Sequence, residues 1–254
     1  MRGTQQRLCQ RYGTALTNGL RFGLGASISL YMDPYVTPSP ERPAREPIFK
    51  IPFVPFIVAL GLVGLFVAQS QLGDGGIGMG LRPADLSQGY LSGLFTHMLV
   101  HGGWTHVLMN AAAVVAFGSP VARDFDKPLG PVGWLAFFTV CGVLAGAGYA
   151  AIHWGDTTPV IGASGAAFGL IGASLRLQAG PGLLIPITHP AILRGAAVWM
   201  GVNLLTGLLG GALAGQGAAI AWEAHAVGFV AGIILIGPFH SLFSRKNHPL
   251  LANR

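Results

Sequence analysis

Charged residues are scarce in this sequence. Asp, Glu, Lys and Arg make up 9% of its 254 residues, whereas they make up about 25% of a soluble domain. Apolar residues account for 52% and the mean hydropathy is +0.57. So little charge cannot cover the surface of a soluble globule, and we therefore expect an integral membrane protein.

Cysteine is rare as well, and the sequence lacks the motifs of common metal sites. The two cysteines, Cys9 and Cys141, lie far apart and form no CxxC pair, which excludes a disulfide framework. There is no HExxH, the zinc motif of metalloproteases. His97 and His101 are four residues apart, so metal binding by this pair stays open as an alternative, but we expect both to hydrogen-bond within a loop. We predict no metal and no cofactor.

Long apolar runs begin after Lys50. A membrane-spanning helix needs about 20 apolar residues, with a range of roughly 17 to 25. Six runs qualify: 51–70, 104–122, 131–152, 160–177, 191–214 and 218–239. The predicted fold is all-α and polytopic, with six transmembrane helices in a domain at 50–240. Residues 1–49, which are rich in proline, are expected to form a flexible cytoplasmic tail, and 241–254 a short cytoplasmic tail.

Lysine and arginine are distributed unevenly over the connections between these runs. All of them except Arg82 fall in the two tails or in alternate loops, on one side of the predicted bundle. Because cytoplasmic connections carry the excess of Lys and Arg, both termini should be cytoplasmic. This asymmetry explains the pI of about 9.8 without a nucleic-acid partner, and the lipid bilayer is the expected surrounding.

Few polar residues lie inside the runs, and each is a functional candidate because burying it in a membrane costs free energy. With a rise of about 1.5 Å per residue, Ser164 lies roughly 18 Å from the cytoplasmic face. Asn110 lies at roughly 20 Å by the same measure, and so does His225 if the last helix ends at Pro238. His106 lies one turn further out. Three helices therefore bring these four residues to one depth.

The fourth run is too short to cross the membrane if its helix begins near Ser164. Residues 155–163 should then enter the membrane as irregular chain, which is tolerated only inside protein or beside a water-filled cavity. Such a cavity would supply water for hydrolysis. Ser164 would also stand at a helix N-terminus, where free N–H groups favour negative charge.

A serine hydroxyl needs an adjacent base to act as a nucleophile, and His225 is the base at the right depth. Acyl transfer also needs donors for the developing oxyanion. The candidates are the backbone N–H of Ser164, the amide of Asn110 and the ring of His106. We predict serine nucleophilic catalysis at these residues.

Two further polar residues do not extend this set to a triad. Glu223 is two residues from His225 and so points about 200° away around the helix. Asn203, in the fifth run, is interpreted as an interhelical hydrogen-bonding residue. The sequence therefore predicts a Ser–His dyad.

Glycine pairs predict that the fourth and sixth helices lie close together. Gly165 and Gly169 form one GxxxG motif, and Gly228 and Gly232 form another. Such pairs let membrane helices approach closely, as a hydrogen bond between Ser164 and His225 requires.

Three motifs in order resemble those of the rhomboid family of intramembrane serine proteases. His106-Val107-Leu108-Met109-Asn110 is similar to its HxxxN, Gly162-Ala163-Ser164-Gly165 to its GxSG, and the stretch from Ala224 to Gly232 to its AHxxGxxxG. The resemblance covers residues 51–240. Two positions differ from the usual pattern. Ser92-Gly93 stands where a Trp-Arg pair often braces the first external loop, and Phe168 replaces a tyrosine that stacks on the histidine.

The resemblance implies that Ser164 is the nucleophile, His225 the general base, and His106 and Asn110 part of the oxyanion hole. It implies transmembrane protein substrates, entry past the fifth helix, a mobile loop at 210–217 and a bacterial inner-membrane location. Three alternatives fit the sequence less well: a metalloprotease, which the missing HExxH opposes; a non-catalytic relative that binds membrane clients, which would lack the serine or histidine; and a transporter, for which no inverted repeat is visible.

Overall fold

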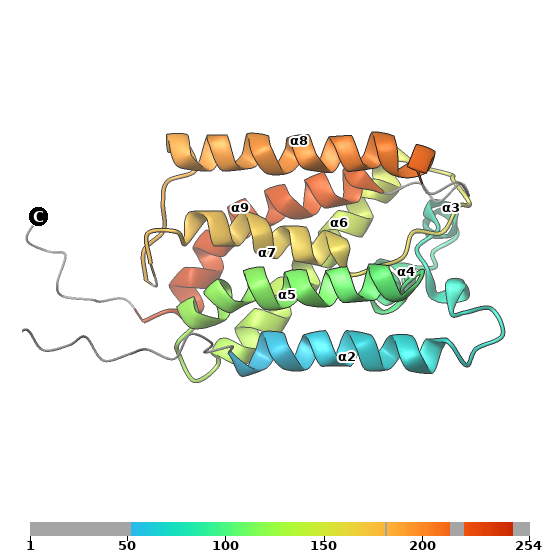
Figure 1. The fold of residues 1–254 in the computed structure, drawn as a ribbon, viewed down its shortest axis with the longest axis horizontal. Coiled ribbons are helices and arrows are strands. Elements are labelled where there is room, and N and C mark those ends of the chain that lie inside the picture. The colour runs from blue at the N-terminus through green and yellow to red at the C-terminus, as the bar shows by residue number, and fades with distance from the viewer. Residues whose placement is uncertain (1–51, 181, 214–220, 246–254) are drawn as a thin grey trace, which may run out of the picture. The chain divides into compact units, whose positions relative to one another are not determined.

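The computed structural model describes residues 52–180, 182–213 and 221–245, and within them the regular secondary structure is helical apart from one isolated bridge. The predicted tail at 1–49 lies outside the described residues. Six of the described helices have 13 residues or more (Figure 1): α2 (Phe53–Gln69), α5 (Trp104–Asp124), α6 (Gly130–Ile152), α7 (Ser164–Arg176), α8 (Pro190–Leu213) and α9 (Trp222–Phe243). The short helices α3 (Pro83–Ser87) and α4 (Gly93–Thr96) lie between α2 and α5.

Each of the six predicted apolar runs overlaps one of these longer helices. Four of them, α5, α6, α8 and α9, are long and apolar enough to cross a membrane. The apolar helix α2 has 17 residues, and α7 has 13. The apolar residues of the sequence are therefore gathered in long helices, four of which could each cross a membrane.

Helix α7 occupies the centre of the bundle, packed against α5, α6 and α9 (Figure 1). Nine of its 13 residues are buried. Helix α8 is different, because large apolar side chains on it remain exposed, among them Val198 at 64% and Leu208 at 67%. Exposed apolar surface on this scale is typical of helices that face lipid.

The glycine pairs on α7 and α9 meet as predicted. A Cβ placed on Gly228 would overlap the carbonyl oxygen of Gly165, and one on Gly232 would overlap that of Gly169. The two backbones are therefore in direct contact, since a side chain at these positions of α9 has no space.

Helix α9 continues past Pro238 to Phe243, so the predicted end at Pro238 is wrong. A proline removes one helical hydrogen bond and bends a helix without always ending it. Beside this region the Arg176 guanidinium donates to the Ile233 carbonyl, with an Nη1–O distance of 3.0 Å. Pro238 removes the helical donor of the Ile234 carbonyl, and Arg176 bonds the neighbouring carbonyl.

A buried carboxylate holds the last turn of α9. Asp124, at the end of α5, accepts hydrogen bonds from Ser244 Oγ at 2.8 Å and from the Gly182 N–H at 3.0 Å. His240 Nδ1 lies 2.8 Å from the same carboxylate. These contacts join the ends of α5 and α9 to the chain after α7, and they give the turn beyond Pro238 a reason to stay helical.

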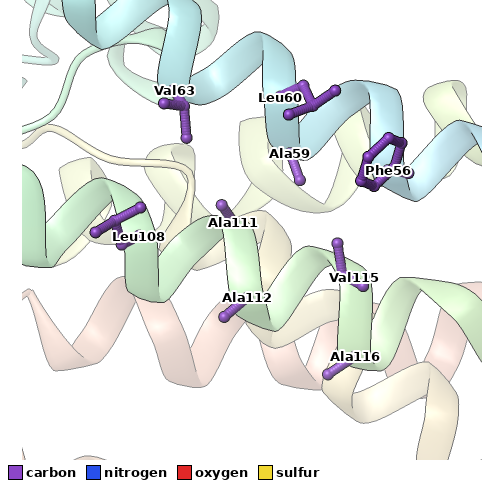
Figure 2. Close-up of a pocket in the computed structure, with 9 residues that line it drawn as sticks. All are labelled: Phe56, Ala59, Leu60, Val63, Leu108, Ala111, Ala112, Val115 and Ala116. Carbon is purple, nitrogen blue, oxygen red and sulfur yellow. The ribbon is translucent and has the colours of Figure 1, made fainter. Parts of the chain in front are cut away.

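An apolar groove of about 460 Å³ lies between α2 and α5 (Figure 2). Phe56, Leu60 and Val63 line it from α2, and Leu108 and Ala111 from α5. Its lining includes none of the polar candidate residues, so this groove is not the candidate active site.

Candidate active site

Ser164 is the first residue of α7, as the sequence predicts. Residues 153–163 before it are not helical, which agrees with the expected irregular segment. Backbone hydrogen bonds hold this segment to the chain between α2 and α5. Leu81 and Val160 exchange two of them, at 2.9 and 2.8 Å, and the Gly162 N–H donates to the His97 carbonyl at 2.8 Å. The loop that presents Ser164 is therefore fixed by main-chain pairing.

Ser164 and His225 lie within hydrogen-bond distance. The separation between Ser164 Oγ and His225 Nε2 is 2.7 Å, and the histidine is 9% exposed. Phe168, one turn along α7, stacks on the imidazole with ring centroids 4.4 Å apart and an interplanar angle of 5°. The imidazole is thus held on one face by a ring and at one edge by the serine.

The second nitrogen of His225 faces Asn203 on α8. Asn203 Oδ1 lies 2.9 Å from His225 Nδ1, and Asn203 Nδ2 donates to the Trp222 carbonyl at 2.8 Å. The interhelical hydrogen bond predicted for Asn203 is therefore present, but its partnership with His225 was missed. The sequence signal that could have indicated this partnership is the presence of an asparagine inside an apolar run.

His106 and Asn110 lie one turn apart on α5 and both face Gly162. A Cβ on Gly162 would lie 2.5 Å from His106 Nε2 and 3.6 Å from Asn110 Nδ2. Gly162 also has a φ of +114°, a conformation that favours glycine. Two side-chain nitrogens therefore converge next to the residue that lies two positions before Ser164.

Both nitrogens are suited to donate. The Gly102 N–H donates to His106 Nδ1 at 3.3 Å, so in the neutral ring this assigns the proton to Nε2. Asn110 Nδ2 is buried without a hydrogen-bond partner among the described residues. A buried donor left unpaired costs about 1–3 kcal/mol, which an acceptor arriving in this space would recover.

The first loop is braced although the Trp-Arg pair is replaced by Ser92-Gly93. A Cβ on Gly93 would lie only 3.1 Å from Leu81 Cα, so the absence of a side chain lets α4 approach the Leu81 backbone. Thr96 Oγ1 donates to the Met79 carbonyl at 2.6 Å. Close backbone packing and this hydrogen bond hold α4 in place.

Gln69, the last residue of α2, makes a second brace. Its Nε2 donates to the His101 carbonyl at 2.6 Å, and its Oε1 accepts from the His101 N–H at 2.9 Å. His97 Nδ1 lies 2.8 Å from the Gly93 carbonyl. Burial lowers the pKa of His101 to about 4 and also lowers the pKa of His97. Burial therefore favours the neutral form of both loop histidines. The predicted hydrogen bond is present for the His97 ring, whereas the His101 ring nitrogens have no partner among the described residues. No group of three or more potential metal ligands gathers among the described residues.

Glu223 faces away from His225, as its spacing predicts. Its Oε1 lies 3.3 Å from His153 Nε2, and the Tyr149 ring stacks on His153 with ring centroids 4.3 Å apart. The carboxylate therefore joins the start of α9 to the end of α6 and takes no part in orienting His225.

The family model of the Rhomboid domain matches residues 88–241, which is more than half of the chain. The protein therefore belongs to the rhomboid family, a class of multi-pass membrane proteins whose members are generally serine proteases. No curated protein matches the sequence.

Proposed function

We propose that this protein is an intramembrane protease that hydrolyses peptide bonds in or near transmembrane segments of other proteins, with Ser164 as nucleophile and His225 as general base. The observation that carries the proposal is the 2.7 Å separation between Ser164 Oγ and His225 Nε2. A nucleophile within hydrogen-bond reach of a base, with the base held by further contacts, is the arrangement that covalent acyl transfer requires.

The reaction follows from this geometry. His225 Nε2 accepts the Ser164 hydroxyl proton as Oγ attacks the scissile carbonyl carbon. The resulting oxyanion accepts hydrogen bonds from the Asn110 amide, from His106 Nε2–H and from the backbone N–H of Ser164 at the start of α7. His225 then gives its proton to the leaving amine as the C–N bond breaks. Water, deprotonated by His225, then attacks the acyl carbon, and His225 returns that proton to Ser164 Oγ as the ester C–O bond breaks.

The surrounding residues support this assignment of roles. Gly162 leaves space beside His106 and Asn110, Phe168 holds the imidazole of His225, and the Gly165 backbone contacts α9 at Gly228. Gly169 and Gly232 continue that contact one turn further along. The retained and mutually placed serine and histidine favour a protease over a relative that only binds membrane clients.

Six membrane crossings with both termini in the cytoplasm form the topology that we propose. It is supported by the overlap of the six apolar runs with six helices and by the placement of all Lys and Arg residues except Arg82 on one side. The tails would then be 1–49 and the residues after α9, and the protein would lie in a cell membrane, the inner membrane if the host is a bacterium.

Substrates would approach from the lipid, past α8. Most large apolar side chains of α8 are exposed, and this helix makes few contacts with α7 and α9 compared with those between α7 and α9 themselves. The first half of the loop predicted to be mobile, residues 210–213, is instead the end of α8, and the second half, 214–217, lies outside the described residues. A transmembrane protein segment is the substrate class that such an entrance would admit.

Cleavage in a reconstituted membrane tests this function. Purified full-length protein is combined in liposomes with a reporter whose transmembrane segment contains small, helix-destabilising residues. We expect cleavage by the wild type and a loss of at least about 10³-fold in Ser164→Ala. Ser174→Ala is the matched control, because the Ser174 hydroxyl bonds the Ile171 carbonyl within its own helix, α7. Equal cleavage by wild type and Ser164→Ala would refute the proposal.

A further inference from the structure

Asn203 is a fully buried polar residue on a helix that is otherwise largely exposed. Its exposure is 1%, whereas its neighbours Val202 and Leu204 are 49% and 42% exposed. Both ends of its amide are used, one by His225 on α9 and the other by the Trp222 carbonyl. Burial with two specific partners indicates that the orientation of this amide is fixed.

The hydrogen bonds determine which amide atom faces the histidine. A backbone carbonyl can only accept, so the atom 2.8 Å from the Trp222 oxygen must be the nitrogen Nδ2. The oxygen Oδ1 therefore faces His225 Nδ1. An amide oxygen can only accept, so Nδ1 must carry a proton, and in the neutral ring Nε2 is then free of one.

This tautomer is the one that proton abstraction requires. A free Nε2 can accept the Ser164 hydroxyl proton, whereas a protonated Nε2 cannot. In serine proteases with a triad, holding the histidine in the correct tautomer is a role of the third residue, and the wrong tautomer lowers kcat about 10⁴-fold. A neutral asparagine fills the corresponding position in some cysteine proteases.

We propose that Asn203 is a positioning residue that holds His225 in the Nδ1–H tautomer, so that the site works as a Ser164–His225–Asn203 chain and not as a dyad. When Nε2 takes the serine proton, Nδ1–H continues to donate to Asn203 Oδ1, whose dipole stabilises the imidazolium. This inference rests on the proposed function and deepens it.

The location of Asn203 adds a consequence for substrate entry. Asn203 is the residue of α8 that bonds the imidazole, so displacement of α8 away from α9 would remove Oδ1 from Nδ1. The packing of α8 against α9 and the tautomer of His225 are therefore coupled: His225 is held in the Nδ1–H tautomer while α8 is packed against α9.

The test uses the full-length protein in detergent micelles, with three variants. Asn203→Leu keeps the side-chain size and removes the acceptor. Asn203→Asp keeps an oxygen for Nδ1–H in either protonation state. Thr206→Ala is the control, because the Thr206 hydroxyl bonds the Asn203 backbone carbonyl within α8 and leaves the Asn203 amide untouched. The rate of Ser164 labelling by a fluorophosphonate and the kcat and KM for a transmembrane reporter are measured. The His225 tautomer is read by ¹⁵N NMR of histidine-labelled protein.

We expect wild-type His225 to be the Nδ1–H tautomer. Asn203→Leu should lose that tautomer and reduce the labelling rate and kcat by about 10²-fold, the low end of the range for general base catalysis, with KM nearly unchanged. Asn203→Asp should keep the tautomer and retain most of the rate. The labelling rate and kcat of Thr206→Ala should stay within about twofold of wild type, because this substitution removes none of the hydrogen bonds that join Ser164, His225 and Asn203.

Three results would overturn the role of Asn203. The first is an Nε2–H tautomer of His225 in the wild type, a result that does not depend on the folding of any variant. The second is an Asn203→Leu protein whose Ser164 is labelled at the wild-type rate. The third is an Asn203→Asp protein whose Ser164 is labelled as slowly as that of Asn203→Leu. Each of these can occur while wild-type Ser164 is labelled. Failure of the proposed function is different, because it shows as a wild-type protein that neither labels at Ser164 nor cleaves the reporter.

Discussion

The Gly228 backbone of α9 touches the Gly165 backbone of α7, and a Cβ on Gly228 would overlap the Gly165 carbonyl oxygen. Ser164 precedes one of these glycines, and His225 lies one turn before the other. The contact therefore sets the distance between the two side chains, and the 2.7 Å approach of Oγ to Nε2 depends on it.

Replacing Gly228 with valine should push the two helices apart. Overpacking of this kind costs about 1–3 kcal/mol, and we expect a lower midpoint of thermal unfolding in detergent and slower labelling of Ser164. Gly201→Ala on α8 is the control, since a Cβ there meets nothing within 4 Å and alanine favours helix by up to about 1 kcal/mol. Equal melting of Gly228→Val and wild type would contradict the tight contact.

Asn110→Ala should slow cleavage without abolishing it. Loss of one oxyanion donor lowers kcat by about 10²–10³-fold, and folding should be preserved because Asn110 Nδ2 has no partner among the described residues. Reporter cleavage in liposomes measures the effect. Ser119→Ala, on the same helix, is the control, because Ser119 Oγ donates to the Val115 carbonyl within α5. An unchanged kcat in Asn110→Ala would make Asn110 a structural residue.

Acidification should destabilise the first loop through His101. Burial lowers its pKa from 6.5 to about 4 in the folded protein, so the unfolded chain binds more protons between these values. Stability therefore rises with pH across this window and is lost as pH falls from about 6.5 toward 4. Thermal melting of wild type and His101→Gln over pH 4–7 measures it, and the variant should show a weaker dependence. Parallel curves for the two proteins would exclude His101 as the cause.

The sequence was sufficient to predict the elements that periodicity and local chemistry define. Helix geometry and the cost of polar groups in lipid were enough to predict the six apolar runs, the start of α7 at Ser164, the irregular segment before it and the orientation of Glu223 away from His225. The paired glycines correctly predicted which two helices lie in contact. These features depend on residues close together in the sequence or on one repeated motif.

Features that depend on how distant helices are rotated could not be predicted in this way. The partner of Asn203 is set by the rotation of α8 relative to α9, and the brace between Gln69 and His101 joins residues 32 positions apart. Helix α9 extends beyond Pro238, where the sequence predicts its end. Asp124, from another helix, bonds His240 and Ser244 beyond the proline.

The central claim is that Ser164 is a nucleophile activated by His225, and the most direct measurement is the site of covalent modification by a fluorophosphonate. Full-length protein in detergent is treated with the probe, digested and analysed by mass spectrometry. We predict one adduct, on the peptide that contains Ser164, and its loss in both Ser164→Ala and His225→Ala. Labelling that persists in Ser164→Ala at the wild-type rate would contradict the account.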